Sequence, residues 1–160
     1  MAKMDLQEKL VSSFMVLENL GELDLDSNVH AIRTEAISAF EKQGFPTKKD
    51  EEWKYTSLRS VLNHDYSVFP KVESEVEFKD VKKYFLHEVD SYKLVFIDGV
   101  YSSFLSDTTH DGYDICLLSA AFKKPKYKMV LDKCYNTLAQ QKNSLTDLNT
   151  AFSMEGAYTV

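Results

Sequence analysis

The residues with the widest chemical range lie in the stretch SDTTHDGYD, at positions 106 to 114. Carboxylate and imidazole side chains gathered in this way could bind a divalent metal ion. The candidate ligands are Asp107, His110, Asp111 and Asp114. Asp and Gly also favour turns for backbone reasons, and a connection is expected at this point of the chain. We therefore interpret the stretch as a turn, with a metal site as its alternative.

The other candidate groups are scattered along the sequence. His30, His64 and His87 show no spacing typical of paired metal ligands on a helix. Cys116 lies in the apolar run ICLL, where burial raises the pKa of a thiol and makes it a poor nucleophile. Cys134 lies far from Cys116 in sequence, and the chain has no Cys-x-x-Cys pair. We therefore expect two buried, reduced thiols.

No phosphate-binding, dinucleotide-binding or nucleophile-elbow motif occurs in the chain. A Ser-His-Asp or Cys-His arrangement stays open, because such partners need not be neighbours in sequence. Nothing in the residues points to one. The sequence therefore predicts no catalytic, cofactor-binding or metal-binding residue.

The stretch GFPTKKDEEWKYTSL, residues 44 to 58, combines mixed charges with the only Trp of the chain. Two of its three carboxylates, Asp50, Glu51 and Glu52, could act as a pair in acid–base catalysis. Their position after Thr47 is better explained by the first turn of a helix, where the helix dipole and a capping arrangement favour acidic side chains. We interpret the stretch as a structural joint, with a binding role for the charges from Lys48 to Lys54 as its alternative.

Trp53 and Tyr55 are expected to place their rings in a groove beside the N-terminal helices. If the Trp53 ring is completely buried, Trp53→Ala should cost about 3–5 kcal/mol of stability. A cost below about 1 kcal/mol would identify the ring as an exposed contact.

The elements that position these residues follow from hydrophobic periodicity. Two amphipathic helices are predicted at about 4–20 and 27–43, and we expect them to form an antiparallel pair. Gly21 should end the first, Ser27 should cap the second, and Gly44 and Pro46 should end it. Their apolar faces consist of Leu6, Leu10, Val11, Phe14, Met15 and Leu17, and of Val29, Ile32, Ala36, Ala39 and Phe40.

The later sequence predicts short, mixed elements. A helical turn is expected at 57–62, a helix from Phe78, a β-hairpin around Asp98-Gly99, and a buried strand that enters a turn or short helix within 113–122. A helix is also expected at 129–134. The last helix should begin at Asn143 or Ser144 and be stopped by Gly156, with its face formed by Leu145, Leu148, Ala151 and Phe152.

Composition is that of an ordinary globular protein. The chain has 160 residues, of which 44% are hydrophobic and 28% charged, enough for one domain with a core. A net charge of −6 argues against a dedicated nucleic-acid binder. The sequence shows no signal peptide and no apolar run long enough to span a bilayer, so we expect a cytoplasmic protein without a membrane partner.

The segment AISAFEKQGFPTKKDEEWKYTSL resembles the N-terminal signature of the SufD family of iron–sulfur cluster assembly proteins. That signature is a helix ending in Gly-Phe-Pro, then a basic residue, an acidic run and Trp-Lys-Tyr-Thr. Here these are Gly44 to Pro46, Lys48 or Lys49, Asp50 to Glu52, and Trp53 to Thr56. LVFIDGVYS and SLTDLNTAFSMEGAYTV are similar to a hairpin of the family and to the helix that leads into its core.

The resemblance implies an α+β fold that continues into a larger domain. Residues 1–143 would form the N-terminal domain, with a helical hairpin and a mixed region that contains a β-hairpin. Residues 144–160 would be a helix and the first strand of a right-handed parallel β-helix that the chain lacks. The chain is therefore expected to be a fragment, whose unpaired strand could produce a truncation-induced homodimer.

The resemblance also implies a function. The chain would be a non-catalytic, structural or protein-interaction part of the SufBCD scaffold. Its SufB-like and SufC-like (ATPase) partners would bind to missing parts of the chain, and the complex would carry a transient iron–sulfur cluster. No cofactor is expected in the chain itself. The alternatives are a free-standing protein-interaction adaptor and a small metal-dependent hydrolase that uses Asp107, His110, Asp111 and Asp114.

Overall fold

The structure is a computed structural model that describes residues 5–19, 28–68, 76–108, 112, 114–138, 143–153 and 156–159. Within these ranges the chain consists of α-helices, 3-10 turns and two small antiparallel sheets, which confirms the predicted α+β class. It forms two compact units, which we call the helical unit (Met1–Val68 with Met129–Ser153) and the sheet unit (Phe69–Lys128 with Met154–Val160). The boundary expected at residue 143 concerns entry into a β-helix and stays a prediction.

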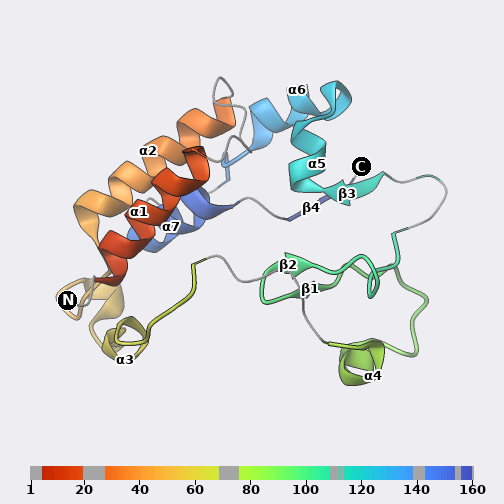
Figure 1. Ribbon diagram of the computed structural model, residues 1–160, viewed down its shortest axis with the longest axis horizontal. Coiled ribbons are helices and arrows are strands. Elements are labelled where there is room, and N and C mark those ends of the chain that lie inside the picture. The colour runs from red at the N-terminus through yellow and green to blue at the C-terminus, as the bar shows by residue number, and fades with distance from the viewer. Residues whose placement is uncertain are drawn as a thin grey trace. The chain divides into compact units, whose positions relative to one another are not determined.

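The helical unit is built on α1 (Leu6–Asn19), α2 (Asn28–Gln43) and α7 (Ser144–Phe152), which lie side by side (Figure 1). The side-chain amide of Gln7, near the start of α1, donates to the carbonyl of Glu41 near the end of α2, at 2.8 Å. At the other end, the hydroxyl of Thr34 donates to Glu18 at 3.2 Å. These contacts confirm that α1 and α2 are antiparallel.

Most of the core of this unit comes from the predicted faces of the three helices, although Ile37 was not predicted on the face of α2 and the predicted Ile32 and Ala39 are only half-buried. Its buried residues are Phe14, Ala36, Ile37, Phe40 and Ala151, and Leu10, Val11, Phe45, Leu148 and Phe152 pack against them. Two aromatic pairs meet edge to face, Phe14 with Phe152 at 6.0 Å and Phe40 with Phe45 at 5.1 Å between ring centroids. Met15 was predicted on this face and is 53% exposed. It follows Phe14 directly, and neighbours in sequence point about 100° apart around a helix.

Gly44 ends α2 as predicted. Its φ of 68° is the left-handed conformation that glycine adopts without strain, and its N–H donates to the carbonyl of Phe40 at 2.7 Å. A Cβ at this position would lie 2.7 Å from the side-chain oxygen of Gln7. The chain therefore needs glycine here both for the turn and for the close approach of α1. The predicted caps Gly21 and Ser27 lie outside the described residues.

Asn143 is the N-cap of α7. It is one of the two residues, Asn143 and Ser144, that were predicted for this position. Its side-chain oxygen accepts from the N–H groups of Leu145 at 3.1 Å and Thr146 at 2.9 Å. The helix ends at Phe152, earlier than the predicted stop at Gly156, because Ser153 has ψ 82° and leaves the helical conformation.

Replacing Asn143 by Ala is expected to lower the free energy of unfolding of the helical unit by about 1 kcal/mol, since two backbone donors lose their acceptor. Urea unfolding followed by far-UV circular dichroism measures this loss. The matched control is Asn149→Ala, at an exposed position of the same helix, which should not be destabilising. Equal losses in the two variants would show that the cap contributes nothing.

Short connecting elements complete the helical unit. They are the 3-10 turn η1 (Glu51–Trp53) and α3 (Arg59–Leu62), which lies within the predicted helical turn at 57–62. The helix α6 (Pro125–Cys134) begins in the sheet unit and ends in the helical unit, and it includes the predicted helix at 129–134.

The sheet unit begins with α4 (Phe78–Val81) and the 3-10 turn η2 (Lys82–Tyr84), where the predicted helix from Phe78 lies. The predicted hairpin is formed by β1 (Phe96–Ile97) and β2 (Val100–Tyr101), which Figure 1 shows as paired arrows. Asp98 and Gly99 between them have φ 51° and 83°. Positive φ at both positions is typical of the tight turn that suits the strand twist.

The second sheet joins β3 (Ile115–Leu117) to β4 (Ala157–Thr159) in antiparallel register, with Cys116 opposite Tyr158. β3 enters α5 (Leu118–Phe122) directly, which confirms the predicted strand and the short helix, one of the two predicted continuations. The prediction that this strand is buried is wrong, because all three of its residues are only half-buried. Leu105, Ala121 and Tyr127 are the buried apolar residues of this unit among those described. The strand β4 exists as predicted, and its continuation into a β-helix stays a prediction.

Candidate functional site

Of the four candidate metal ligands of the sheet unit, only Asp107 and Asp114 lie among the described residues. His110 and Asp111 are among those not described. The backbone of Asp107 forms an isolated bridge with that of Lys93. The N–H of Lys93 donates to the carbonyl of Asp107 at 3.2 Å, and the N–H of Asp107 donates to the carbonyl of Lys93 at 2.8 Å. The carboxylate of Asp114 accepts from the side chains of Lys126 and Tyr127. No cluster of three or more His, Cys, Asp or Glu suited to a metal ion occurs within the described ranges.

The contacts of Asp114 form a small structural network. The hydrogen bond from Lys126, then that from Tyr127, and the charge of Lys126 hold the pKa of Asp114 below its ordinary value. The same contacts raise the pKa of Lys126 and of Tyr127. The Tyr127 ring is buried and lies 4.7 Å from the ring of Tyr158. Asp114 thus fixes the start of α6 against the second sheet.

The low pKa of Asp114 predicts that the sheet unit is less stable in acid. A carboxyl group whose pKa is lower in the folded than in the unfolded state stabilises the fold above its unfolded pKa, and this contribution is lost as the pH falls through the folded pKa. Asp114→Asn should therefore lower the urea midpoint at pH 7, and the difference from the wild type should disappear as the pH falls through the lowered pKa of the folded state. Asp90→Asn, at an exposed position, is the control. A wild-type midpoint for Asp114→Asn at pH 7 would contradict the proposed network.

The remaining histidines and the two cysteines are not brought together. His30 Nε2 lies 3.6 Å from Glu18, the ring of His64 lies edge-on to Tyr66, and His87 is exposed. Both thiols are free, as predicted, but the prediction that they are buried is wrong. Cys116 is half-buried because a two-stranded sheet cannot cover both of its faces, and Cys134 is exposed as the last residue of α6.

The charged joint after α2 is a hydrogen-bonded turn, as the predicted structural joint requires, but the helix start expected near Thr47 is only the three-residue 3-10 turn η1, whose N-cap Asp50 makes no side-chain capping bond to it. Asp50 accepts from the backbone N–H of Thr47 at 2.7 Å and from its hydroxyl at 3.1 Å. The Thr47 hydroxyl in turn accepts from the N–H of Lys49 at 3.2 Å. The backbone hydrogen bond from Thr47, then the one from its hydroxyl, lowers the pKa of Asp50. Glu51 and Glu52 follow as the first two residues of η1, which is too short for a helix dipole to account for them.

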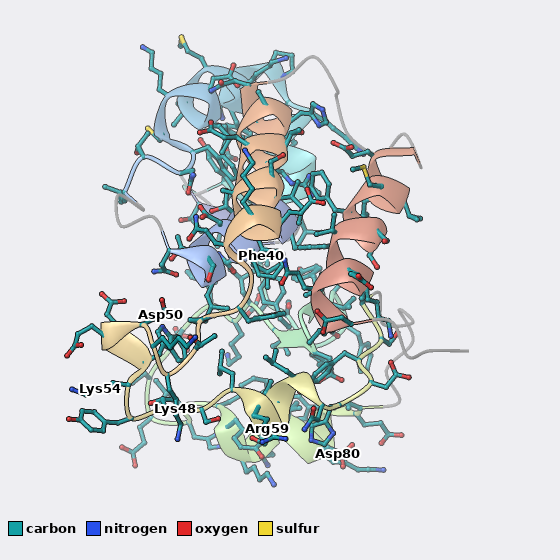
Figure 2. All side chains as sticks on the ribbon, turned by 90° about the vertical axis from the view of Figure 1, so that its left-hand side faces the viewer. Phe40, Lys48, Asp50, Lys54, Arg59 and Asp80 are labelled. Carbon is teal, nitrogen blue, oxygen red and sulfur yellow. The ribbon has the colours of Figure 1, made fainter. Side chains whose placement is uncertain are left out.

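The joint forms one wall of a cleft of about 630 Å³ in the helical unit. Figure 2 shows Asp50 and Lys54 on the segment that follows the end of α2, where Phe40 lies. Asn143 and Ser144, from the start of α7, form another part of the cleft. The complete lining is Gln43, Gly44, Phe45, Pro46, Thr47, Lys49, Asp50, Glu51, Glu52, Trp53, Asn143 and Ser144. This cleft is the candidate functional site.

The two aromatic rings of the joint differ from the prediction. Trp53 is half-buried in the cleft wall, so the expected complete burial is wrong. Tyr55, which was expected in a groove, is 91% exposed. The turn after η1 directs it away from the helices, and Lys54 Nζ lies 5.7 Å from its ring. The joint therefore exposes the Tyr55 ring to solvent, whereas the Trp53 ring is half covered in the cleft wall.

Because the Trp53 ring is half-buried, Trp53→Ala is expected to lower the free energy of unfolding by about 1–2 kcal/mol. This lies below the range expected for complete burial. Urea unfolding followed by far-UV circular dichroism gives the value, and Tyr55→Ala is the control that should cost less than about 0.5 kcal/mol. A loss above about 3 kcal/mol would show that the ring is a core residue.

Two features of the helical unit were missed by the sequence analysis. Arg33 is buried at 2% exposure, and its Nε donates to the carbonyl of Ala151 at 2.7 Å. Its place four residues after Val29 and four before Ile37, on the apolar stripe, is the signal that could have found it. The second feature is the start of α7 in the cleft, for which the sequence carries no local signal.

A shallow apolar groove of about 510 Å³ also lies in the helical unit, between α1 and α7. It is lined by Leu6, Leu10, Phe45, Tyr66, Ser67, Val68, Leu145, Leu148, Asn149 and Phe152. Several of these side chains belong to the predicted apolar faces of the two helices.

No helix among the described residues is long and apolar enough to cross a membrane.

Comparison with known proteins identifies the chain through almost its whole length. The family model described as "SufBD protein N-terminal region" matches residues 4–159. The iron–sulfur cluster assembly protein SufD of Escherichia coli (strain K12) is 38% identical over 77 residues, which is 48% of this chain and 17% of that protein. No solved structure matches significantly. The family match extends over both compact units, and on this basis the chain belongs to the SufBD family, as its N-terminal region.

Proposed function

We propose that the chain is the N-terminal, non-catalytic part of a SufD-like component of a SufBCD-type scaffold for iron–sulfur cluster assembly. The observation that carries the proposal is the family match over residues 4–159, supported by the similarity to SufD of Escherichia coli. In this proposal the protein works in the cytoplasm with SufB-like and SufC-like partners. The cluster is the cargo of the assembled complex, and ATP hydrolysis belongs to the SufC-like subunit.

The geometry of the chain supports a structural or protein-interaction role. The carboxylate of Asp114, one of the two described metal-ligand candidates, is occupied by Lys126 and Tyr127. The joint that resembles the family signature ends a helix, caps a turn and forms the wall of an open cleft. These contacts fix the conformation of the joint and of the surface it forms. A structural or protein-interaction region of a scaffold is expected to have such a surface.

Co-purification tests the proposal. The natural protein that contains this chain would be produced together with SufB-like and SufC-like proteins of the same organism and analysed by size-exclusion chromatography at micromolar concentration. We expect the three to elute together. We also expect co-elution after removal of residues 1–160, since the proposal places the partner contacts outside this chain. Separate elution of the natural protein would contradict the assignment to the scaffold.

A further inference from the structure

Three polar groups in the cleft wall have no partner among the described residues. Ser144 is only 7% exposed and lines the cleft, yet its hydroxyl forms no hydrogen bond there. The indole N–H of Trp53 and the carboxylate of Glu52 are also without a hydrogen bond or ion pair within the described part of the chain. The hydroxyl of Ser144 is not among the buried side-chain atoms that lack a partner, so it reaches the solvent of the cleft and is accessible to a ligand there.

The charge of the cleft favours a cation. Three carboxylates line it, at Asp50, Glu51 and Glu52, against the single ammonium of Lys49. Asp50 is held by Thr47, whereas Glu51 is 4.0 Å from Lys54 Nζ and its side chain is 90% exposed. Such a long, exposed contact contributes little, so Glu51 and Glu52 are available to an incoming positive charge. An anion at the start of α7 would face the same carboxylates and be repelled.

An arginine side chain fits these groups best. Its guanidinium is planar, stacks on the face of a Trp ring and donates in pairs to carboxylates. In the cleft the ring of Trp53 and the carboxylates of Glu51 and Glu52 offer both contacts. The indole N–H of Trp53 could donate to a peptide carbonyl, and the hydroxyl of Ser144 could accept from a peptide N–H. A small cation would leave the Trp53 ring and its N–H unused.

We propose that this cleft is a docking site for an arginine-containing, basic segment of a partner protein. The site extends the proposed function, because it adds a contact within residues 43–53 and 143–144 that does not depend on how the rest of the scaffold assembles. It gives the joint after α2 a role in recognition in addition to its structural role.

Trp53 is the only Trp of the chain, so its fluorescence reports on the cleft alone. The 160-residue chain would be titrated with the peptide Gly-Gly-Arg-Gly-Arg-Gly-Gly, and with a counterpart in which Glu replaces both Arg. We expect a saturable change in emission with the arginine peptide and none with the glutamate peptide. The affinity should fall as salt is added, because exposed charges are screened.

A double variant, Glu51→Gln with Glu52→Gln, should weaken binding about three- to tenfold. The matched control is Glu88→Gln with Asp90→Asn, which removes the same charge from exposed positions outside the cleft and should leave the affinity within about twofold. Circular dichroism verifies that both variants are folded. Equal weakening by the two variants, binding of the glutamate peptide, or no change in Trp53 emission at millimolar peptide would each overturn the proposal. Loss of co-elution with the scaffold partners would overturn the proposed function and leave this docking site standing.

Discussion

Replacing Phe40 by Ala is expected to lower the free energy of unfolding of the helical unit by about 3–5 kcal/mol. The ring is 0% exposed and belongs to the core cluster with Phe14, Ile37 and Ala151. Phe45 meets it edge-on at 5.1 Å between ring centroids. Alanine would remove this packing and leave a cavity that helices fixed on both sides cannot close. Urea unfolding monitored by the fluorescence of Trp53, which lies in the same unit, measures the loss.

Phe104→Ala is the matched control, since it deletes the same group at a position that is 84% exposed. It should change the free energy of unfolding by no more than about 0.5 kcal/mol. A Phe40→Ala loss below about 1 kcal/mol would contradict the placement of Phe40 in the core. Such a result would also remove the basis for the cleft, because Phe45 is both a neighbour of Phe40 and part of the cleft lining.

The sequence predicted those elements that short-range patterns control. The apolar stripe of α2 predicts a buried Phe40, and the glycine that follows the helix predicts its end. The Asp98-Gly99 pair predicts the hairpin because only a few residues accept positive φ. The resemblance carried by residues 36–58 predicted the family that the comparison then showed.

The cleft could not be predicted in the same way. It forms where the joint after α2 meets the start of α7, and Trp53 and Ser144 are separated in sequence by most of the chain. No periodicity joins two such segments, because their contact depends on how α2 and α7 pack. The error at Tyr55 has a similar cause. A pattern of aromatic residues shows that rings are present, while the backbone turn after η1 decides which of them faces solvent.

Replacing Arg33 by Ala is expected to lower the free energy of unfolding of the helical unit by about 2–4 kcal/mol. Arg33 lies in the core with its guanidinium 5.8 Å from the centroid of the Phe14 ring. Its Nε satisfies the carbonyl of Ala151 in the last turn of α7, where no helical N–H is available. Alanine would remove both the packed side chain and this donor, so α7 would lose a contact to α2. Urea unfolding followed by Trp53 fluorescence measures the loss.

Arg33→Met distinguishes packing from charge at this position. Burial lowers the pKa of Arg33, whereas the electrostatic interactions with Tyr135 and Glu18 act to raise it. The Nη2 atom of Arg33 is buried without a hydrogen-bond partner among the described residues. Removing the guanidinium therefore relieves a desolvation cost, while methionine still fills the core beside Phe14. The carbonyl of Ala151 is left unpaired, so we expect a loss of about 1–2 kcal/mol, smaller than for alanine. A methionine variant as unstable as the alanine variant would contradict this ranking. It would show that the polar contacts of the guanidinium, first of all its hydrogen bond to the carbonyl of Ala151, and not its packing, hold α7 against α2.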